Sequence, residues 1–360
     1  MEPDTPTLIP TDILVTGGCG FIGSNFIRYL LTESDFSGRV VNIDKLTYAG
    51  NPENLSDIQA RFPDRYRLIR ADICDRGAVR DVFRRHEISA VCHFAAESHV
   101  DRSIVAPDAF IKTNVEGTFT LLEVAREQAA GFKLFHHVST DEVYGSLGAE
   151  GCFTEETAYR PNSPYSASKA ASDHLVRAYG ETYGLPVTIS NCSNNYGPYQ
   201  FPEKLIPLMI LHAIEGQPLP VYGQGVNVRD WLYVADHCRA VWRVMQRGRR
   251  GRVYNVGGRC EMANIDTVSR ICDLIDEILP GSALRPRREL ITFVKDRPGH
   301  DLRYAIDCSR IENELDWRPL ESFESGLRKT ISWYIDHRDW VERVRSGEYQ
   351  TWVRQHYGTI

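Results

Sequence analysis

The chain has 360 residues, of which 42% are hydrophobic and 25% are charged, a composition typical of a globular protein with a sizeable core. The formal net charge is −6 and Lys and Arg do not cluster, so we expect no nucleic-acid partner. Residues 1–10 lack the features of a signal peptide and no apolar run approaches the ~20 residues that span a bilayer, so we expect a cytoplasmic protein that does not bind membranes.

Short apolar segments alternate with helical patterns over the first 190 residues. Apolar residues recur at helical spacing from Ile22 to Leu31, and a long helix is predicted over about 108–129. Strands are predicted at 13–16, 40–43, 66–69, 90–94, 134–138 and 187–190. This alternation predicts an α/β fold with a parallel sheet covered by helices on both faces.

The second half of the sequence is less regular. Pro, Gly, Tyr and Asn are frequent between Asn194 and Arg229, so loops and short elements are predicted there. A strand is predicted at 253–256 and an amphipathic helix over 265–278. We expect the C-terminal third to build a smaller second domain.

A glycine-rich turn joins the first predicted strand to the first predicted helix. Gly17, Gly20 and Gly23 are spaced as in phosphate-binding turns, where the backbone approaches a pyrophosphate at a helix N-terminus. Asp44 ends the second predicted strand, where a carboxylate can accept from the ribose diol of NAD, and the adjacent Lys45 slightly weakens the preference over NADP. The alternative is a glycine turn that only packs a helix onto the sheet.

Asp72 and Ile73 follow the third predicted strand, where an adenine edge would lie. An acidic residue at a strand end is common, so a structural role is an equal alternative.

Tyr165 and Lys169 lie four residues apart at the start of a predicted helix and therefore share one helix face. A nearby ammonium group is expected to lower the tyrosine pKa, so that Tyr165 could accept a hydroxyl proton during oxidation. Lys169 would also reach the nicotinamide ribose. An exposed surface pair is the alternative.

The fifth predicted strand ends at Thr140-Asp141-Glu142, on the side of the sheet where ligands bind. Hydride transfer does not need two adjacent carboxyl groups, whereas dehydration needs a base for a carbon-bound proton and an acid for the departing hydroxide. Burial and charge repulsion could push the two pKa values apart and divide these roles. The alternative is a turn in which Asp141 caps a backbone N–H.

Together these motifs resemble the extended short-chain dehydrogenase/reductases, and within them the bacterial dTDP-glucose 4,6-dehydratases. The resemblance covers almost the whole chain, from Ile13 to about Tyr357. It rests, in order, on the segments 16–23, 44–51, 94–103, 139–145, 165–169, 192–198, 201–207, 229–233 and 296–301.

The resemblance implies a cycle that oxidises C4 of the sugar onto tightly bound NAD, eliminates water across C5 and C6, and returns hydride to C6. Tyr165 would take the C4 hydroxyl proton and Thr140 would bind the sugar near C4. Glu142 would remove the C5 proton while Asp141 protonates the leaving hydroxyl. The product would be a 4-keto-6-deoxy sugar nucleotide, and no metal is expected.

The resemblance also implies two sets of binding residues. Besides Tyr165 and Lys169, the expected cofactor-binding residues are Gly17, Gly20, Phe21, Ile22, Gly23, Asp44, Lys45, Leu46, Thr47, Asp72, Ile73, Phe94, Ala95, Ala96, Ser98, Thr113 and Asn195. The expected substrate-binding residues are Ser98, Thr140, Asn194, Lys204, Leu205, Pro220, Val221, Tyr222, Arg229, Asn264, Asp296, Arg297, Pro298, Gly299 and His300. Without the resemblance, Arg229 would be interpreted as a surface or ion-paired residue, and Asn264 as a helix cap.

The implied fold is a modified Rossmann fold, a doubly wound parallel sheet, with a smaller discontinuous α/β substrate domain. The NAD-binding domain would comprise 11–190 and about 228–258, and the nucleotide-sugar domain about 191–227 and 259–360. Relatives dimerise through a four-helix bundle, here residues 108–129 and 165–183, although an ordinary core-facing stripe would look the same.

Three other functions remain open. A UDP-sugar 4,6-dehydratase would differ only in the nucleotide pocket. A nucleotide-sugar 4-epimerase is disfavoured by Asp141 and Glu142, because the related epimerases carry small or hydroxyl residues there. An NAD-binding scaffold or sensor would not need both carboxyl groups and the Tyr165–Lys169 pair. The nine scattered cysteines form no CxxC pair and favour reduced thiols.

Overall fold

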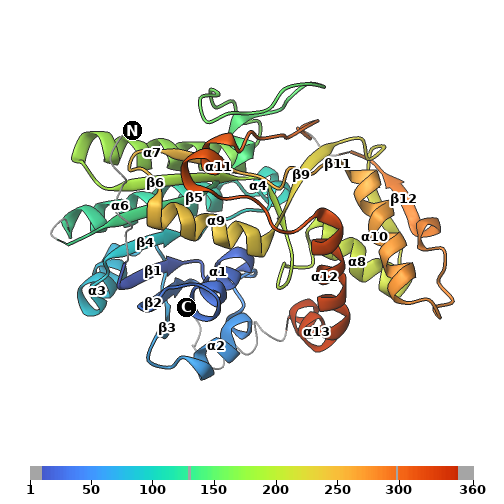
Figure 1. The fold of residues 1–360 in the computed structure, drawn as a ribbon, viewed down its shortest axis with the longest axis horizontal. Coiled ribbons are helices and arrows are strands. Elements are labelled where there is room, and N and C mark those ends of the chain that lie inside the picture. Colours follow the sequence, from blue (N-terminus) through green and yellow to red (C-terminus); the bar gives the residue numbers. More distant parts are fainter. Residues whose placement is uncertain (1–9, 129–130, 297–298, 348–360) are drawn as a thin grey trace.

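The computed structural model describes residues 10–128, 131–296 and 299–347 (Figure 1). Within these residues, a seven-stranded sheet has the order β10-β6-β5-β4-β1-β2-β3, and every neighbouring pair is parallel. Its strands are β1 Asp12–Thr16, β2 Arg39–Asp44, β3 Tyr66–Arg70, β4 Ala90–His93, β5 Leu134–Thr140, β6 Val187–Cys192 and β10 Val253–Val256. The predicted strands and the parallel sheet are therefore confirmed.

The order of the strands reverses between β1 and β4. From β1 the chain builds outward to β2 and β3, and from β4 it builds the other way to β5 and β6. In open α/β sheets, ligands bind at the carboxyl ends of the strands next to such a reversal. The glycine turn after β1 and the Thr140 segment after β5 both lie at this edge.

Alternate residues of the central strand enter two different cores, as expected for a sheet that is covered on both faces. Ile13 and Val15 pack with the helices α1 Phe21–Thr32 and α9 Val234–Arg247. Leu14 packs on the opposite face. That face is covered by α3 Arg76–His86, α6 Thr118–Glu127 and α7 Pro164–Tyr183 (Figure 1).

The predicted helix over 108–129 is helical but not regular, and residue 129 lies outside the described part. It begins as α5 Asp108–Phe110, continues as a π-helix Ile111–Gly117, and ends as α6. The Asn114 side chain accepts from Glu97 N at 2.8 Å and donates to Glu97 O at 3.0 Å. These bonds tie the wide turn to the loop after β4. The turn carries Thr113, which lines a cavity at the carboxyl edge of the large sheet.

The prediction of only loops and short elements between Asn194 and Arg229 is wrong for part of this segment, because Leu205–Glu215 forms the 11-residue helix α8. The same segment contributes to two small sheets, one formed by β7 Asn194–Tyr196, β9 Val228–Tyr233 and β11 Glu261–Ala263, and one formed by β8 Leu219–Tyr222 and β12 Ile291–Val294. Apolar residues of α8 are buried in a separate core with α10 Asn264–Ile278, α12 Phe323–Asp336 and α13 Arg338–Ser346. Periodicity did not reveal α8, because it is apolar on most faces.

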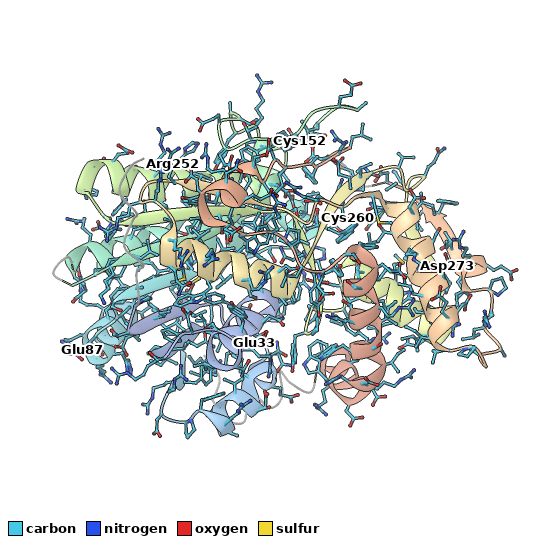
Figure 2. All side chains as sticks on the ribbon, in the orientation of Figure 1. Glu33, Glu87, Cys152, Arg252, Cys260 and Asp273 are labelled. Atoms are coloured by element: carbon cyan, nitrogen blue, oxygen red, sulfur yellow. The ribbon has the colours of Figure 1, made fainter. Side chains whose placement is uncertain are left out.

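The remaining helices are short. They are α2 Ser56–Arg61, α4 Val100–Val105, α11 Ser309–Leu315 and the 3₁₀ helices η1 Pro52–Leu55, η3 Asp141–Tyr144 and η4 Arg287–Leu290. Charged side chains such as Glu33 and Glu87 project from the outer surface (Figure 2). Among the helices of the described part, none combines the length and apolarity needed to span a bilayer.

Candidate active site

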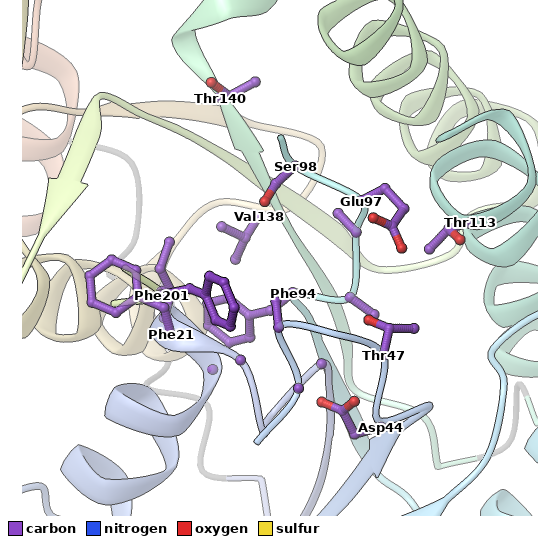
Figure 3. Close-up of a pocket in the computed structure, with 18 of the residues that line it drawn as sticks. Phe21, Asp44, Thr47, Phe94, Glu97, Ser98, Thr113, Val138, Thr140 and Phe201 are labelled. Carbon is purple, nitrogen blue, oxygen red and sulfur yellow. The ribbon is translucent and has the colours of Figure 1, made fainter. Parts of the chain in front are cut away.

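A cavity of about 320 Å³ opens at the carboxyl edge of the large sheet. Its walls come from the turn after β1, the loops after β2, β3 and β4, the end of β5, the start of α7, and the segment from β6 to α8. Figure 3 shows the cavity extending from Asp44 to Thr140, with Phe94 and Ser98 between them. An elongated cavity of this kind suits a dinucleotide with its sugar substrate.

The turn after β1 needs glycine for two separate reasons. Gly17 has a φ of +69°, and a Cβ there would lie 2.7 Å from the backbone of Ala95. A Cβ on Gly23 would lie 2.4 Å from the carbonyl oxygen of Gly17. No side chain caps the N-terminus of α1, which begins at Phe21. The backbone N–H groups of this helix end are therefore suited to a pyrophosphate.

Asp44 lies at the end of β2 and lines the cavity. Its carboxylate accepts from Cys19 N at 2.9 Å and from Leu46 N at 2.8 Å. Burial raises the pKa of Asp44, and these two backbone hydrogen bonds oppose the rise. Each carboxylate oxygen keeps a further lone pair, so Asp44 can still accept from a ribose hydroxyl.

Lys45 and Asp72 form an ion pair of 2.8 Å on the same side of the cavity. Asp72 also accepts from Cys74 N at 2.9 Å. The pair ties the loop after β2 to the loop after β3. Both residues line the cavity, so their structural pairing and a contact with an adenosine group are compatible.

Tyr165 lies in the first turn of α7, which a capping box between Ser163 and Ser166 starts. Its side chain is buried and lines the cavity, and the Thr140 side chain acts to lower its pKa. Burial and the Glu142 carboxylate raise the pKa of Tyr165. The predicted lowering of the Tyr165 pKa is therefore wrong for the chain by itself, because burial and the nearby carboxyl groups raise this pKa and the Lys169 ammonium group donates to Val138 O instead.

Lys169 lines the cavity from the same face of α7, as predicted, but its ammonium group makes other contacts. Nζ donates to Val138 O at 2.9 Å and lies 3.3 Å from His137 Nε2. His137 Nε2 in turn lies 3.2 Å from a carboxylate oxygen of Asp173. Burial lowers the pKa of Lys169 while Asp173 opposes this, and burial raises the pKa of Asp173 to about 6.

The two adjacent carboxyl groups after β5 have different surroundings. Asp141 is 1% exposed, and its Oδ2 has no hydrogen-bond partner within the described residues. Its Oδ1 accepts from Thr140 Oγ1 at 3.4 Å. Burial, then Glu142 and Asp230, raise the pKa of Asp141 well above its ordinary value, while Arg229 opposes the rise. Asp141 is therefore suited to remain a neutral acid.

Glu142 is less buried than Asp141 and lines the cavity. Its backbone N–H donates to Thr140 Oγ1 at 3.3 Å, so Thr140 caps the 3₁₀ helix η3. The alternative in which Asp141 caps this turn is thus not observed. The two carboxyl groups differ in burial, as a division between acid and base requires.

The family model for GDP-mannose 4,6 dehydratase matches residues 14–330. The dTDP-glucose 4,6-dehydratase of Shigella flexneri is 56% identical over 362 residues, covering 96% of this chain and 98% of that protein. The chain belongs to the bacterial dTDP-glucose 4,6-dehydratase family.

Solved structures place this dTDP-glucose 4,6-dehydratase family member among proteins of the same fold. DesIV of Streptomyces venezuelae, a dTDP-glucose 4,6-dehydratase crystallised with NAD and TYD, matches with a TM-score of 0.86 at 46% identity and covers 92% of this chain and 99% of its own. The UDP-glucose 4-epimerase of Thermotoga maritima matches with a TM-score of 0.79 at 27% identity, covering 90% and 99%. The fold is therefore shared with epimerases, and the modified Rossmann fold is confirmed.

Most of the residues predicted for the dehydratase cofactor line the cavity. They are Gly17, Gly20, Phe21, Ile22, Gly23, Asp44, Lys45, Thr47, Asp72, Ile73, Phe94, Ala95, Ala96, Ser98, Thr113, Tyr165, Lys169 and Asn195. Leu46 is not among the lining residues, because it is buried beside Cys19 and contributes its backbone N–H to Asp44.

The predicted substrate residues fall into two groups. Ser98, Thr140, Asn194 and Lys204 line the cavity together with Glu142. Asn194 Oδ1 is buried without a hydrogen-bond partner in the described part of the chain, which suits a ligand contact. Leu205, Pro220, Val221, Tyr222, Arg229, Asn264, Asp296, Gly299 and His300 do not line it, and Arg297 and Pro298 lie outside the described residues.

Arg229 is 6% exposed, so the alternative of a surface arginine is not observed. It donates to Val228 O at 2.8 Å and Asp301 O at 3.1 Å and lies over the ring of Tyr304. Asn264 begins α10 and does not cap it. Its Oδ1 is buried without a hydrogen-bond partner among the described residues.

Three of the predicted substrate residues that do not line the cavity, Asp296, His300 and Tyr222, lie close to one another. Asp296 contacts His300 at 2.6 Å, and the rings of His300 and Tyr222 lie 6.1 Å apart.

Several cavity residues were not predicted. Tyr48, Glu97, Gln200, Phe201 and Glu203 line the cavity. Phe201 and Glu203 lie inside a segment that carried the resemblance, and Tyr48 follows Thr47 directly, so the signal was position within a motif. Glu97 also lies inside such a segment, 94–103, whereas Gln200 lies between two of them and gave no signal.

Proposed function

We propose that this chain converts dTDP-glucose to dTDP-4-keto-6-deoxyglucose and water. The observation that carries the proposal is the arrangement after β5. A buried Asp141 and a cavity-lining Glu142 follow Thr140, which lines the same cavity as Tyr165 and Lys169. High identity over 96% of the chain to dTDP-glucose 4,6-dehydratases supports the same assignment.

We propose that the cavity holds NAD. The fit is supported by the uncapped start of α1, the positive φ of Gly17 and the carboxylate of Asp44. When bound, NAD would supply a hydride acceptor for C4 and a hydride donor for C6, and its cationic ring would add positive charge that favours a phenolate at Tyr165. Lys169 would hold the nicotinamide ribose.

The side chains of the protein would then move three protons. Tyr165 accepts the proton of the C4 hydroxyl, and Thr140 orients that hydroxyl. The resulting 4-keto group acidifies the C5 proton, which Glu142 removes. Asp141 donates its proton to the C6 hydroxyl, so that the C6–O bond breaks and water leaves. Glu142 then returns a proton to C5. The starting state is restored when the proton that Tyr165 took from the C4 hydroxyl passes to Asp141, so that the net change is the loss of one water from the sugar.

The nucleotide of the substrate would lie toward the small sheets. We propose that Arg229 and Lys204 balance the diphosphate charge, and that Asn264, Tyr222 and His300 contact the nucleotide. The large sheet, with 11–190 and about 228–258, would form the NAD-binding domain. Residues 191–227 and 259–360 would form the nucleotide-sugar domain.

We further propose a homodimer formed by the segment 108–129 and α7. The exposed fractions of Val105, Ile111, Phe119 and Tyr183 are 86%, 53%, 41% and 54%, and all four residues lie on these helices or on the adjacent α4. A helix pair from each protomer would cover this apolar surface. We also propose a cytoplasmic location, which suits the nine free cysteines.

Incubation with dTDP-glucose in heavy water tests the proposed reaction. Mass spectrometry should detect loss of one water and gain of one deuterium at C5. Unchanged substrate would contradict dehydration, and dTDP-galactose would identify an epimerase. A parallel incubation with UDP-glucose measures the nucleotide preference, and equal rates would contradict a specific dTDP site.

A further inference from the structure

Three side chains from distant parts of the sequence meet at one rim of the cavity. Tyr48 lies in the loop after β2, Arg102 lies in α4, and Glu203 lies just before α8. Tyr48 and Glu203 line the cavity. The side chain of Arg102 is 51% exposed and that of Glu203 is 19% exposed, so the group lies where the cavity reaches solvent.

The three side chains contact one another in a closed triangle. Tyr48 OH donates to Glu203 Oε1 at 3.1 Å, and Arg102 Nη2 donates to Glu203 Oε2 at 3.2 Å. The guanidinium carbon of Arg102 lies 3.7 Å from the centre of the Tyr48 ring, which is a close cation–π contact. The ring of Phe201 meets the ring of Tyr48 edge-on, with centres 5.6 Å apart.

More contacts hold the three side chains of the triangle in place than hold an ordinary surface ion pair. Burial and Glu203 raise the pKa of Tyr48, so its hydroxyl remains a hydrogen-bond donor. The neighbouring Lys204 Nζ donates to Ser98 O at 3.0 Å and joins the same two segments a second time. Each contact is weak by itself, but three contacts within one small group can act together.

The position of the triangle relates it to the cofactor. The loop with Tyr48 follows Asp44 on the adenosine side, and the segment with Arg102 follows Ser98 on the sugar side. Glu203 comes from the segment that leads into α8. The triangle therefore joins three segments, the loop after β2, α4 and the segment before α8, at the rim of the cavity.

We propose that Tyr48, Arg102 and Glu203 form a clamp that retains the dinucleotide in the cavity from one turnover to the next. The inference rests on the proposed function. If NADH left between the oxidation of C4 and the reduction of C6, the 4-keto sugar could not be converted to product. An enzyme that exchanges its cofactor in each turnover would have no use for such a clamp. These residues are positioning residues, since they contact no reacting atom.

Exchange of bound NAD tests the clamp without any catalytic turnover. The holoenzyme is loaded with isotopically labelled NAD and chased with unlabelled NAD, and the retained label is followed by rapid gel filtration. Arg102→Ala and Glu203→Gln should each exchange NAD about tenfold faster than the wild type. Tenfold corresponds to about 1.4 kcal/mol. Arg102→Lys should restore only part of the retention, because an ammonium group lacks the planar face that stacks on Tyr48.

The double variant separates a clamp from two independent contacts. If Arg102 and Glu203 act as one unit, the double variant should exchange NAD no faster than the faster single variant. If the double variant instead exchanges NAD faster by the product of the two single-variant factors, the proposal is overturned. Arg84→Ala is the matched control, because Arg84 pairs with Asp81 on α3, far from the cavity residues. Its exchange rate should equal that of the wild type.

NAD exchange at the wild-type rate in both single variants would also overturn the clamp. A raised KM for dTDP-glucose in those same variants would then assign the three residues to substrate entry. Because the exchange assay contains no sugar, its outcome is independent of whether the wild-type protein dehydrates dTDP-glucose.

Discussion

Replacing Asp141 by asparagine removes the proposed acid while keeping its size and its bond to Thr140. Asp141 is 1% exposed, and its Oδ2 has no hydrogen-bond partner among the described residues. The charged form would therefore be poorly solvated, which is why burial raises its pKa. An asparagine mimics the neutral carboxylic acid but cannot give a proton to the C6 hydroxyl.

The expected effect on rate follows from the usual value of a positioned acid. General acid catalysis typically contributes ~10²–10⁴-fold, so elimination should slow by that factor, or by about 2.7–5.5 kcal/mol. Oxidation at C4 should continue, because Tyr165 and Thr140 are unchanged. The variant should therefore accumulate NADH and a 4-keto sugar that keeps its C6 hydroxyl.

Asp141→Asn should slow the reaction but raise the stability of the fold. Folding raises the pKa of Asp141, so between the unfolded and folded pKa values the native state binds more protons than the unfolded state. Wild-type stability is therefore lost as the pH rises through that window, and Asp141→Asn should not share this loss. At neutral pH the free energy of unfolding of the variant should exceed that of the wild type by ~1–3 kcal/mol.

Stopped-flow absorbance of NADH, mass spectrometry of the sugar and urea unfolding at several pH values measure these quantities. In heavy water, Asp141→Asn should still exchange the C5 proton of the 4-keto sugar, because Glu142 remains. Product formation at the wild-type rate would refute the acid role of Asp141. Loss of C4 oxidation would place Asp141 in a different step.

Three further substitutions test other parts of the site. Glu142→Gln should retain NAD and oxidise C4 but stall before elimination; deuterium at C5 of the stalled sugar would contradict a base role. Gly17→Ala should lower stability by ~1–3 kcal/mol and weaken NAD binding, because of its positive φ and the contact with Ala95; unchanged urea unfolding and NAD affinity would argue against this constraint. Asp173→Asn removes a buried negative charge that favours protonated Lys169, so the pKa that limits C4 oxidation should shift; an unchanged pH profile would disconnect Asp173 from Lys169.

Much of the fold could be predicted because its signals are local. Buried strands such as 13–16 are short apolar runs, and the glycine turn requires a particular backbone path at Gly17. The helix α8 was missed because its residues are apolar on most faces and gave no periodic pattern. The π-helical turn at Ile111–Gly117 depends on a side chain–backbone contact between Asn114 and Glu97, which no local pattern reveals.

In the candidate site, too, some features follow from local sequence and others depend on tertiary contacts. The positions of Tyr165, Lys169 and Glu142 at the cavity could be predicted from a strand end and one helix face, whereas Asp141 is buried and is not among the residues that line the cavity. Their catalytic roles stay predictions. Their electrostatics could not be predicted, because the pKa of Tyr165 depends on burial and on Glu142, which lies elsewhere in the chain. The contact of Lys169 with His137 and Asp173, and the triangle around Tyr48, likewise depend on tertiary packing.

A structure of Glu142→Gln with NAD and dTDP-glucose bound is the most direct test of the proposed division between acid and base. The account predicts that the side chain at position 142 contacts C5 of the hexose and that Asp141 lies within hydrogen-bond distance of the C6 hydroxyl. A hexose seated with both of these side chains turned away from C5 and C6 would contradict it.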